Sequence, residues 1–246
     1  MVCTIPSKTP RLADGNVTTP LSPRFNLFEN TLTTAVARWN IPLTRSRIER
    51  LHTHFVLMVE ANRVMNLTRI IQPVEAAIKH YADSLALLKW VKQCGLAVRT
   101  VLDIGTGAGF PSVPLAILQP NWRVTAIDAT RRKIEFIREI ADRIGLSNLC
   151  LEHAHSDHWR PSRSFELVVT RAAGRLPRCL PGAARLLDQG GWFIAYKTAR
   201  VGQDELRDAG TTLRRLPLRV QEPFPYELDC EGRKLRRVLY VYRRVG

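Results

Sequence analysis

Apolar residues in the first part of the chain recur with the period of an α-helix. They are Phe25, Phe28, Leu32 and Trp39, followed by Ile48, Leu51, Phe55 and Met58. Thr44 is a suitable N-cap for a second helix, and a third is expected from Pro73 to near Gly95, because proline suits a first turn and glycine follows helix ends. Residues 25–95 are therefore predicted to form a helical lobe. Residues 1–24, with four prolines among Ser and Thr, are expected to form a flexible tail.

From Arg99 onward, short apolar runs alternate with helical segments. Strands are predicted at TVLDI (100–104), RVTAIDA (123–129), NLCLEHA (148–154), FELVVTRA (165–172), GWFIAYK (191–197) and LRRVLYVYR (235–243). Helices are expected to start at PSVPLAIL (111–118) and to cover 130–145. This alternation is typical of an α/β domain whose mostly parallel sheet is covered by helices on both faces, here over residues 96–246.

Charge adds a candidate partner. The chain has 246 residues with 37 Lys+Arg against 22 Asp+Glu, for a net charge of +15, and most of the basic residues are arginine. Arginine binds phosphate and stacks on bases, which favours a nucleic-acid partner over the alternative of an arginine-rich but ordinary surface. No apolar run is long enough to span a membrane, and residues 1–11 do not read as a secretory signal. Five widely spaced cysteines suit reduced thiols in a cytoplasm. The protein is also expected to be a monomer.

The segment with the clearest chemistry is Asp103-Ile104-Gly105-Thr106-Gly107-Ala108-Gly109-Phe110. Glycines between a strand and a helix let the backbone turn sharply and lie against a ligand. A dinucleotide fingerprint would need its third glycine at position 110, which is Phe110. The spacing instead suits the adenosylmethionine loop of a Rossmann-like methyltransferase, with Asp103 facing the cationic cofactor and Asp128 accepting from its ribose. The alternatives are a turn glycine at Gly105 and a helix-terminal acid at Asp128.

Longer motifs surround this loop. They are Asn66-Leu67-Thr68, Lys79-His80-Tyr81-Ala82-Asp83-Ser84-Leu85, DIGTGAGFPSVPLAI (103–117), Thr170-Arg171-Ala172 and Ala195-Tyr196-Lys197. Together they resemble the RsmG/GidB family of bacterial 16S rRNA guanine-N7 methyltransferases, over residues 49–240. The resemblance implies a Rossmann-like class I methyltransferase with a mostly parallel seven-stranded sheet. It also implies S-adenosylmethionine as cofactor and 16S rRNA or the small ribosomal subunit as partner.

Site residues follow from the resemblance. Those expected at the cofactor are Asp103, Gly105, Thr106, Gly107, Gly109, Phe110, Pro111, Asp128, Ala129, Asp157 and Arg171. Those expected in catalysis are Arg171, Lys197, Asn66, His80 and Asp83. Arg171 and Lys197, at strand ends, are interpreted as holding RNA backbone or the guanine O6 edge, the alternative being surface salt bridges. Asn66, His80 and Asp83 come from the helical lobe. For them the alternative is a helix cap and an i,i+4 pair between Lys79 and Asp83.

Several positions depart from the family pattern. Ser112, Ala129, Thr198 and His155 replace residues that are usual there, and the change at His155 bears on the adenine side of the cofactor. Arg131, Arg132 and Lys133 are candidate RNA phosphate contacts. No metal is expected at His153, His155 and His158. The competing functions are a methyltransferase of the same fold for a small molecule or protein, and an RNA-binding module without catalysis.

Overall fold

The computed structural model describes residues 23–171 and 174–246, so the expected tail lies almost entirely outside the described residues. The N-terminal elements are α1 (Pro23–Val36), the 3-10 turn η1 (Ala37–Trp39), α2 (Arg45–Met65), α3 (Pro73–Ala76), the π-helical η2 (Ala77–Ala82) and α4 (Asp83–Gln93). Thr44 caps α2 by accepting a hydrogen bond from Arg47 N. The elements α3, η2 and α4 follow one another without a break, as the expected third helix requires.

The strands form one eight-stranded sheet, which corrects the expected count of seven. They are β1 (Thr100–Ile104), β2 (Arg123–Asp128), β3 (Leu149–His153), β4 (Phe165–Arg171), β5 (Leu187–Thr198), β6 (Leu218–Val220), β7 (Phe224–Cys230) and β8 (Arg233–Arg244). The order is β3-β2-β1-β4-β5-β8-β6, with β7 also paired to β8. The run β3-β2-β1-β4-β5 is parallel, and β6, β7 and β8 pair antiparallel. β6 was not predicted because it is short. β7 was not predicted because Pro225 lies within it and its exposed face is acidic.

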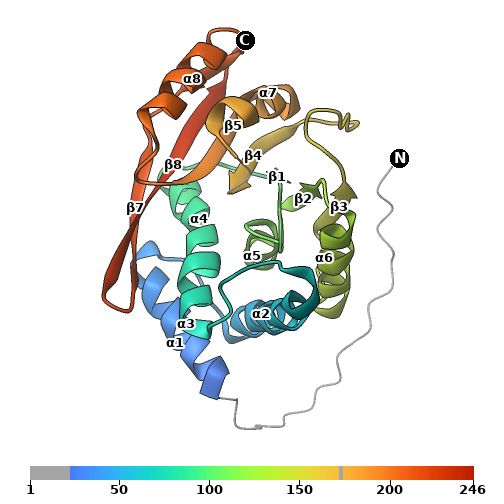
Figure 1. The fold of residues 1–246 in the computed structure, drawn as a ribbon, viewed down its shortest axis with the longest axis vertical. Coiled ribbons are helices and arrows are strands. Elements are labelled where there is room, and N and C mark those ends of the chain that lie inside the picture. The colour runs from blue at the N-terminus through green and yellow to red at the C-terminus, as the bar shows by residue number, and fades with distance from the viewer. Residues whose placement is uncertain (1–22, 172–173) are drawn as a thin grey trace.

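Helices cover both faces of the sheet (Figure 1). They are α5 (Ser112–Leu118), α6 (Arg131–Arg143), α7 (Leu176–Leu186) and α8 (Gln203–Leu213). Along β1, Val101 belongs to the core shared with α4, α5 and α6, whereas Leu102 belongs to the core shared with α7. This alternation is that of a strand buried on both faces.

The helical N-terminal part packs into the same core as the sheet domain. One apolar cluster contains Phe28 of α1 and Met58 of α2 together with Val124 of β2 and Leu239 of β8. Burial of this shared surface holds the N-terminal helices against the side of the sheet that α5 and α6 also cover. Among the described residues, none of the helices has the length and apolarity to cross a membrane.

Candidate functional site

The glycine loop joins β1 to α5 at the carboxyl edge of the sheet. Its glycines have positive φ angles of 74° at Gly105, 62° at Gly107 and 96° at Gly109. A Cβ at Gly109 would lie 2.7 Å from Val113 Cγ2, whereas a Cβ at Gly107 would meet no atom within 4 Å. Gly109 is therefore needed for packing, and the loop at Gly107 faces open space in which a ligand can approach the backbone.

Asp128 holds this loop from the end of β2. Its Oδ2 accepts a hydrogen bond from Gly107 N at 3.0 Å, and its Oδ1 accepts one from Thr130 N at 2.8 Å. Lys133 Nζ lies 3.9 Å from Oδ2. Each carboxylate oxygen retains lone pairs for a further donor, so Asp128 can also receive ligand hydroxyl groups.

Asp103 lies fully buried at the end of β1. Its Oδ2 accepts from Ser112 N at 3.2 Å, while Oδ1 has no hydrogen-bond partner among the described residues. Burial raises the pKa of Asp103 to about 7, against the opposing effects of the nearby Thr106 and Ser112 and of the charge of Arg171. A buried acceptor without a partner calls for a ligand or a water, and a cationic donor would suit it.

Arg171, at the end of β4, lies at the centre of a second cluster. Its Nη1 donates to Lys79 O at 2.8 Å and to Asp83 Oδ2 at 3.0 Å. Its Nη2 lies 3.1 Å from His80 Nδ1, and its guanidinium lies 5.1 Å from the Phe110 ring centroid. A guanidinium has five N–H groups, of which these contacts use three. The other two remain for a ligand, since no described residue accepts from them.

His80 is neutral and has one defined tautomer. Burial, followed by the charge of Arg171, lowers the pKa of His80 to about 3. Because Arg171 can only donate, His80 Nδ1 accepts, and Nε2–H donates to Thr68 Oγ1 at 2.9 Å. The imidazole stacks on Phe110 with 4.6 Å between ring centroids. The aromatic ring of Phe110 thus lies against both His80 and Arg171, and joins the glycine loop to the helical part.

Asp83 anchors Arg171 from the start of α4. Its Oδ1 accepts from Tyr226 Oη at 2.7 Å, and Arg237 Nε lies 3.6 Å from the same oxygen. The alternative of an i,i+4 pair with Lys79 is wrong, because Lys79 pairs with Glu75 instead. Tyr226 was not among the predicted site residues, since β7 was not predicted.

His54 is a further residue that the sequence reading missed. It lies fully buried in α2, where its Nε2 lies 2.9 Å from Ala108 O in the glycine loop and its Nδ1 lies 2.9 Å from Tyr81 Oη. Burial lowers the pKa of His54 to about 4. The neutral ring donates to the loop and accepts from the tyrosine, so α2 fixes the position of the loop. The only sequence signal was a histidine on the apolar face of α2, beside Leu51 and Phe55.

Four predicted site residues lie outside these two clusters. Lys197 Nζ donates to Gly174 O and to Glu205 Oε1, both at 2.7 Å. Asn66 is the exposed, left-handed cap of α2 with φ 50°. Ala129 and Asp157 are exposed on the turns after β2 and β3. Their roles therefore stay predictions.

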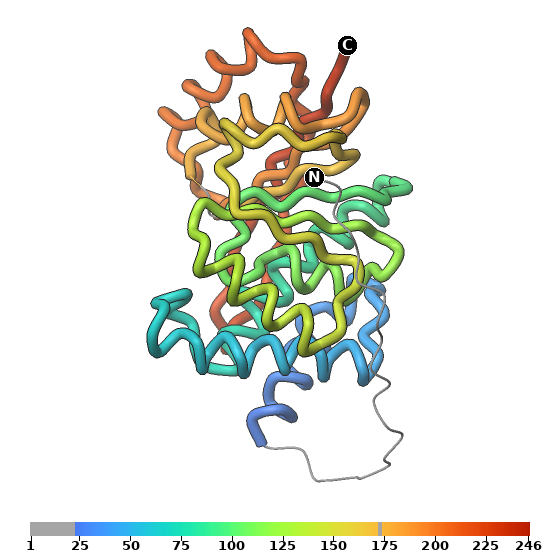
Figure 2. The backbone as a smooth tube through the Cα atoms, turned by 90° about the vertical axis from the view of Figure 1, so that its right-hand side faces the viewer, coloured from blue at the N-terminus to red at the C-terminus, as the bar shows by residue number. Residues whose placement is uncertain are grey.

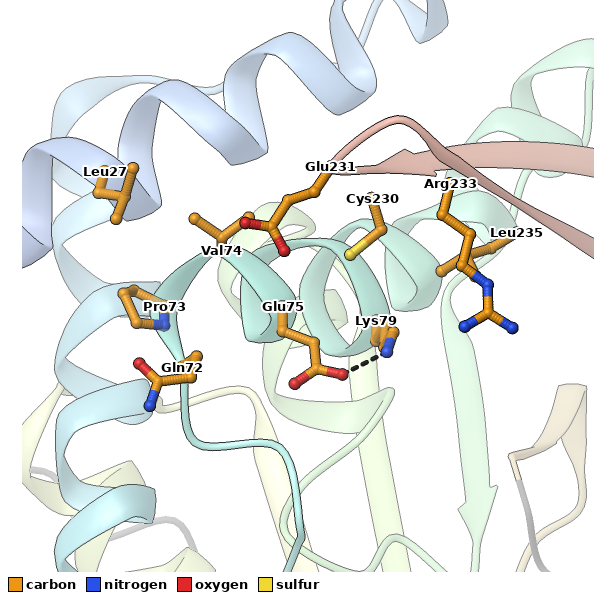
Figure 3. Close-up of a pocket in the computed structure, with 10 residues that line it drawn as sticks. All are labelled: Leu27, Gln72, Pro73, Val74, Glu75, Lys79, Cys230, Glu231, Arg233 and Leu235. Atoms are coloured by element: carbon orange, nitrogen blue, oxygen red, sulfur yellow. Dashed lines mark hydrogen bonds and ion pairs between the residues drawn. The ribbon is translucent and has the colours of Figure 1, made fainter.

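A separate pocket of about 430 Å³ lies between α1, α3 and the β7–β8 hairpin (Figure 3). Its lining includes Glu75, Lys79, Glu231 and Arg233, which carry charges of both signs. The side chain of Lys79 faces this pocket and its ion pair with Glu75 (Figure 3), whereas its carbonyl receives Arg171. The pocket therefore lies on the other side of that helical turn and is not part of the cluster around Arg171.

Comparison with known proteins decides the family. The family model "GidB: rRNA small subunit methyltransferase G" matches residues 47–220. The chain belongs to the GidB family. The Ribosomal RNA small subunit methyltransferase G of Lysinibacillus sphaericus is 32% identical over 215 residues, covering 86% of this chain and 88% of the relative. That of Desulfitobacterium hafniense is 35% identical over 201 residues, covering 79% and 81%. The resemblance drawn from the motifs is thus confirmed.

Solved structures support the GidB fold. The YcgJ protein from Bacillus subtilis has a TM-score of 0.52 at 16% identity, covering 66% of this chain and 98% of that chain. A structure from Thermoplasma acidophilum, described as a candidate methyltransferase, has a TM-score of 0.50 at 13% identity, covering 62% and 71%. These likenesses confirm the expected Rossmann-like α/β fold, with the corrected strand count.

Ser112, which replaces the residue usual in the GidB family, preserves the hydrogen bonds of the glycine loop. Ser112 N donates to Asp103, and the Ser112 hydroxyl lies 2.5 Å from Thr106 Oγ1. The side chain thus adds a hydrogen bond within the loop, where the usual glycine would have none. Phe110 and Pro111, joined by a cis peptide bond, close the loop onto α5.

Proposed function

We propose that this chain transfers a methyl group from S-adenosylmethionine to N7 of a guanine in 16S rRNA. The observation that carries the proposal is the arrangement of Asp103 and Asp128 on either side of the glycine loop, within a chain of the GidB family. They end adjacent parallel strands beside β4, where the chain connections change direction along the sheet. Such an edge is where doubly wound α/β proteins bind their ligands.

The described residues fit the cofactor. The orphaned Oδ1 of Asp103 is suited to its ammonium group, and Asp128 to its ribose hydroxyls. The space over Gly107 admits a ligand to the loop backbone, and the two spare N–H groups of Arg171 suit a carboxylate. Asp157 and Ala129 are assigned to the adenine end. When bound, S-adenosylmethionine supplies an electrophilic methyl group.

The proposed reaction requires no general base. Guanine N7 has a free lone pair, so its methylation needs no proton abstraction by the protein. The neutral state of His80 and His54 agrees with this, because each ring has its nitrogens engaged in fixed hydrogen bonds. The protein's role is to orient the base and exclude water, and such positioning can supply several kcal/mol of the barrier, roughly 7–11 in favourable cases. Lys197 is assigned to the base edge or the RNA backbone. Arg171 is assigned to this RNA edge as well as to the cofactor, which share its two spare N–H groups.

The partner is assigned as 16S rRNA or the small ribosomal subunit, on which the chain would act as a cytoplasmic monomer. The high positive charge supports a polyanionic partner. The test is to incubate purified protein with labelled S-adenosylmethionine and either naked 16S rRNA or small subunits, and to map the label. Label on guanine N7 in 16S rRNA is expected. Label only on a metabolite or protein, or RNA binding without cofactor binding, would reject the proposal in favour of its rivals.

A further inference from the structure

The end of α2 and the turn that follows protrude from the carboxyl edge of the molecule. In Figure 2 this part, coloured teal, projects at the left, ahead of the sheet and its loops. We call its four outward side chains, Arg63, Val64, Arg69 and Ile71, the lip. The lip lies on the same side of the molecule as the glycine loop, because His80 hydrogen-bonds to Thr68 beside the lip and stacks on Phe110 of the loop.

The lip exposes apolar side chains. Val64 is 71% exposed and Ile71 is 45% exposed, so they rank among the more exposed large hydrophobic residues of the described chain. Their neighbours Met65, Leu67 and Ile70 pack against the core. A single exposed valine needs no explanation. Val64, in the last turn of α2, and Ile71, in the segment that follows the helix, both present apolar side chains to a partner.

Unpaired positive charge accompanies these side chains. Arg63 and Arg69 are both exposed, and neither has an ion pair with a described residue. Residues 61–74 contain no Asp or Glu. Some exposed arginines do form ion pairs, as Arg175 does with Asp204 and Asp208. The lip therefore attracts anions more strongly than such paired surfaces do.

The lip is held in one conformation and connected to the site. Asn62 Oδ1 accepts from Thr68 N at 2.8 Å, and Thr68 Oγ1 accepts from Ile70 N at 3.0 Å. The same Thr68 hydroxyl receives His80 Nε2–H, and His80 in turn receives Arg171. The turn thus reaches the guanidinium of Arg171 through two hydrogen bonds, so that its outer side chains are preorganised beside the proposed methylation site.

We propose that the lip docks the RNA substrate, with Arg63 and Arg69 on backbone phosphates and Val64 and Ile71 against the face of an unstacked base next to the target guanine. Proteins that bind single-stranded nucleic acid place cationic groups on the phosphates, and enzymes that act on an extruded base hold it between aromatic or apolar side chains. The inference rests on the proposed function, since it takes 16S rRNA as the partner. A protein of the small subunit is the competing occupant.

The test compares three double variants in binding to naked 16S rRNA at several salt concentrations. Arg63→Ala with Arg69→Ala should weaken binding by about tenfold and reduce the salt dependence by about one to two released counterions, because each phosphate contact contributes about one. Val64→Ser with Ile71→Ser should weaken binding severalfold with the salt dependence unchanged. The matched control is Arg99→Ala with Arg123→Ala, two exposed arginines at the opposite, amino edge of the sheet, which should change little.

Cofactor affinity, measured on the same variants, should match the wild type, which confirms that the folded site is intact. Equal RNA affinity and salt dependence in the lip and control variants would overturn the inference. So would a lip variant that loses affinity for small subunits but not for naked 16S rRNA, because the occupant would then be a protein. If the wild type itself fails to methylate 16S rRNA, the proposed function falls, whereas wild-type methylation with unaffected lip variants rejects the lip alone.

Discussion

The pKa of Asp103 gives a quantitative prediction for cofactor binding. In the free protein burial raises it to about 7, so near neutral pH a large fraction of the protein carries a neutral Asp103. A cationic ligand at Oδ1 favours the ionised form and therefore must displace the proton. If the bound cofactor displaces this proton completely, the Kd for the cofactor is proportional to one plus the ratio of protonated to ionised Asp103 in the free protein. Affinity should then fall about fivefold from pH 7 to pH 6 and approach tenfold per unit below that.

Asp103 gives folding stability the opposite pH dependence to that of cofactor affinity: stability falls as the pH rises. An acid whose folded pKa is raised above its unfolded value near 4 loses folding stability as the pH rises from about 4 through about 7. Replacement by Asn removes the titration. Asp103→Asn should therefore unfold at equal or higher denaturant concentration than the wild type above pH 7, and bind the cofactor weakly at every pH.

Isothermal titration of the wild type and of Asp103→Asn with S-adenosylmethionine between pH 5.5 and pH 7 tests the reasoning. In this range the cofactor's α-amino group stays mostly protonated. His80 and His54 stay neutral, with pKa values of about 3 and about 4. A pH-independent wild-type affinity, or the same slope in Asp103→Asn, would refute the assignment of Asp103 to a cationic part of the cofactor.

Three further predictions concern other parts of the site. Gly109→Ala should lower the free energy of unfolding by about 2–4 kcal/mol in denaturant titrations, since it combines positive φ with a Cβ 2.7 Å from Val113 Cγ2; unchanged stability would contradict the loop geometry. Tyr226→Phe removes a donor from buried Asp83, so it should cost about 1–3 kcal/mol of stability and weaken cofactor binding severalfold; wild-type values in both assays would refute it. Lys197→Ala should slow methylation of RNA with cofactor affinity unchanged, and Glu205→Gln controls for their ion pair; an unchanged rate would remove Lys197 from the site.

Periodicity predicted the parts of the fold whose burial follows a simple pattern. The strand at β1 and the helix from Pro73 read clearly because their apolar residues face one or two continuous cores. β7 was missed although its buried residues alternate as in a strand, because Pro225 lies within it and its exposed face carries Glu227 and Asp229, residue types that are depleted in strands. β6 is only three residues long, with one buried residue, and gives no periodic signal.

The motifs predicted the residue types of the site but not their partners. His80 and Asp83 share one helix face, and that face does meet Arg171. The contacts of Tyr226 with Asp83 and of His54 with Ala108 join segments far apart in sequence, and only the folded core brings them together. Local spacing favoured the pair Lys79–Asp83, but the nearby Glu75 and the buried Arg171 compete for these charges more strongly.

The most direct test of the proposed reaction is to map N7-methylguanine in 16S rRNA from cells that contain this protein, cells that lack it and cells that lack it but are complemented. N7 methylation places a positive charge on the ring, and chemical cleavage at the modified base locates it. One site should be methylated in wild-type cells, unmethylated without the protein and restored by the wild-type chain but not by Gly107→Arg, which fills the open space over the loop. An identical pattern of N7-methylguanine in all of these rRNAs would contradict the proposal.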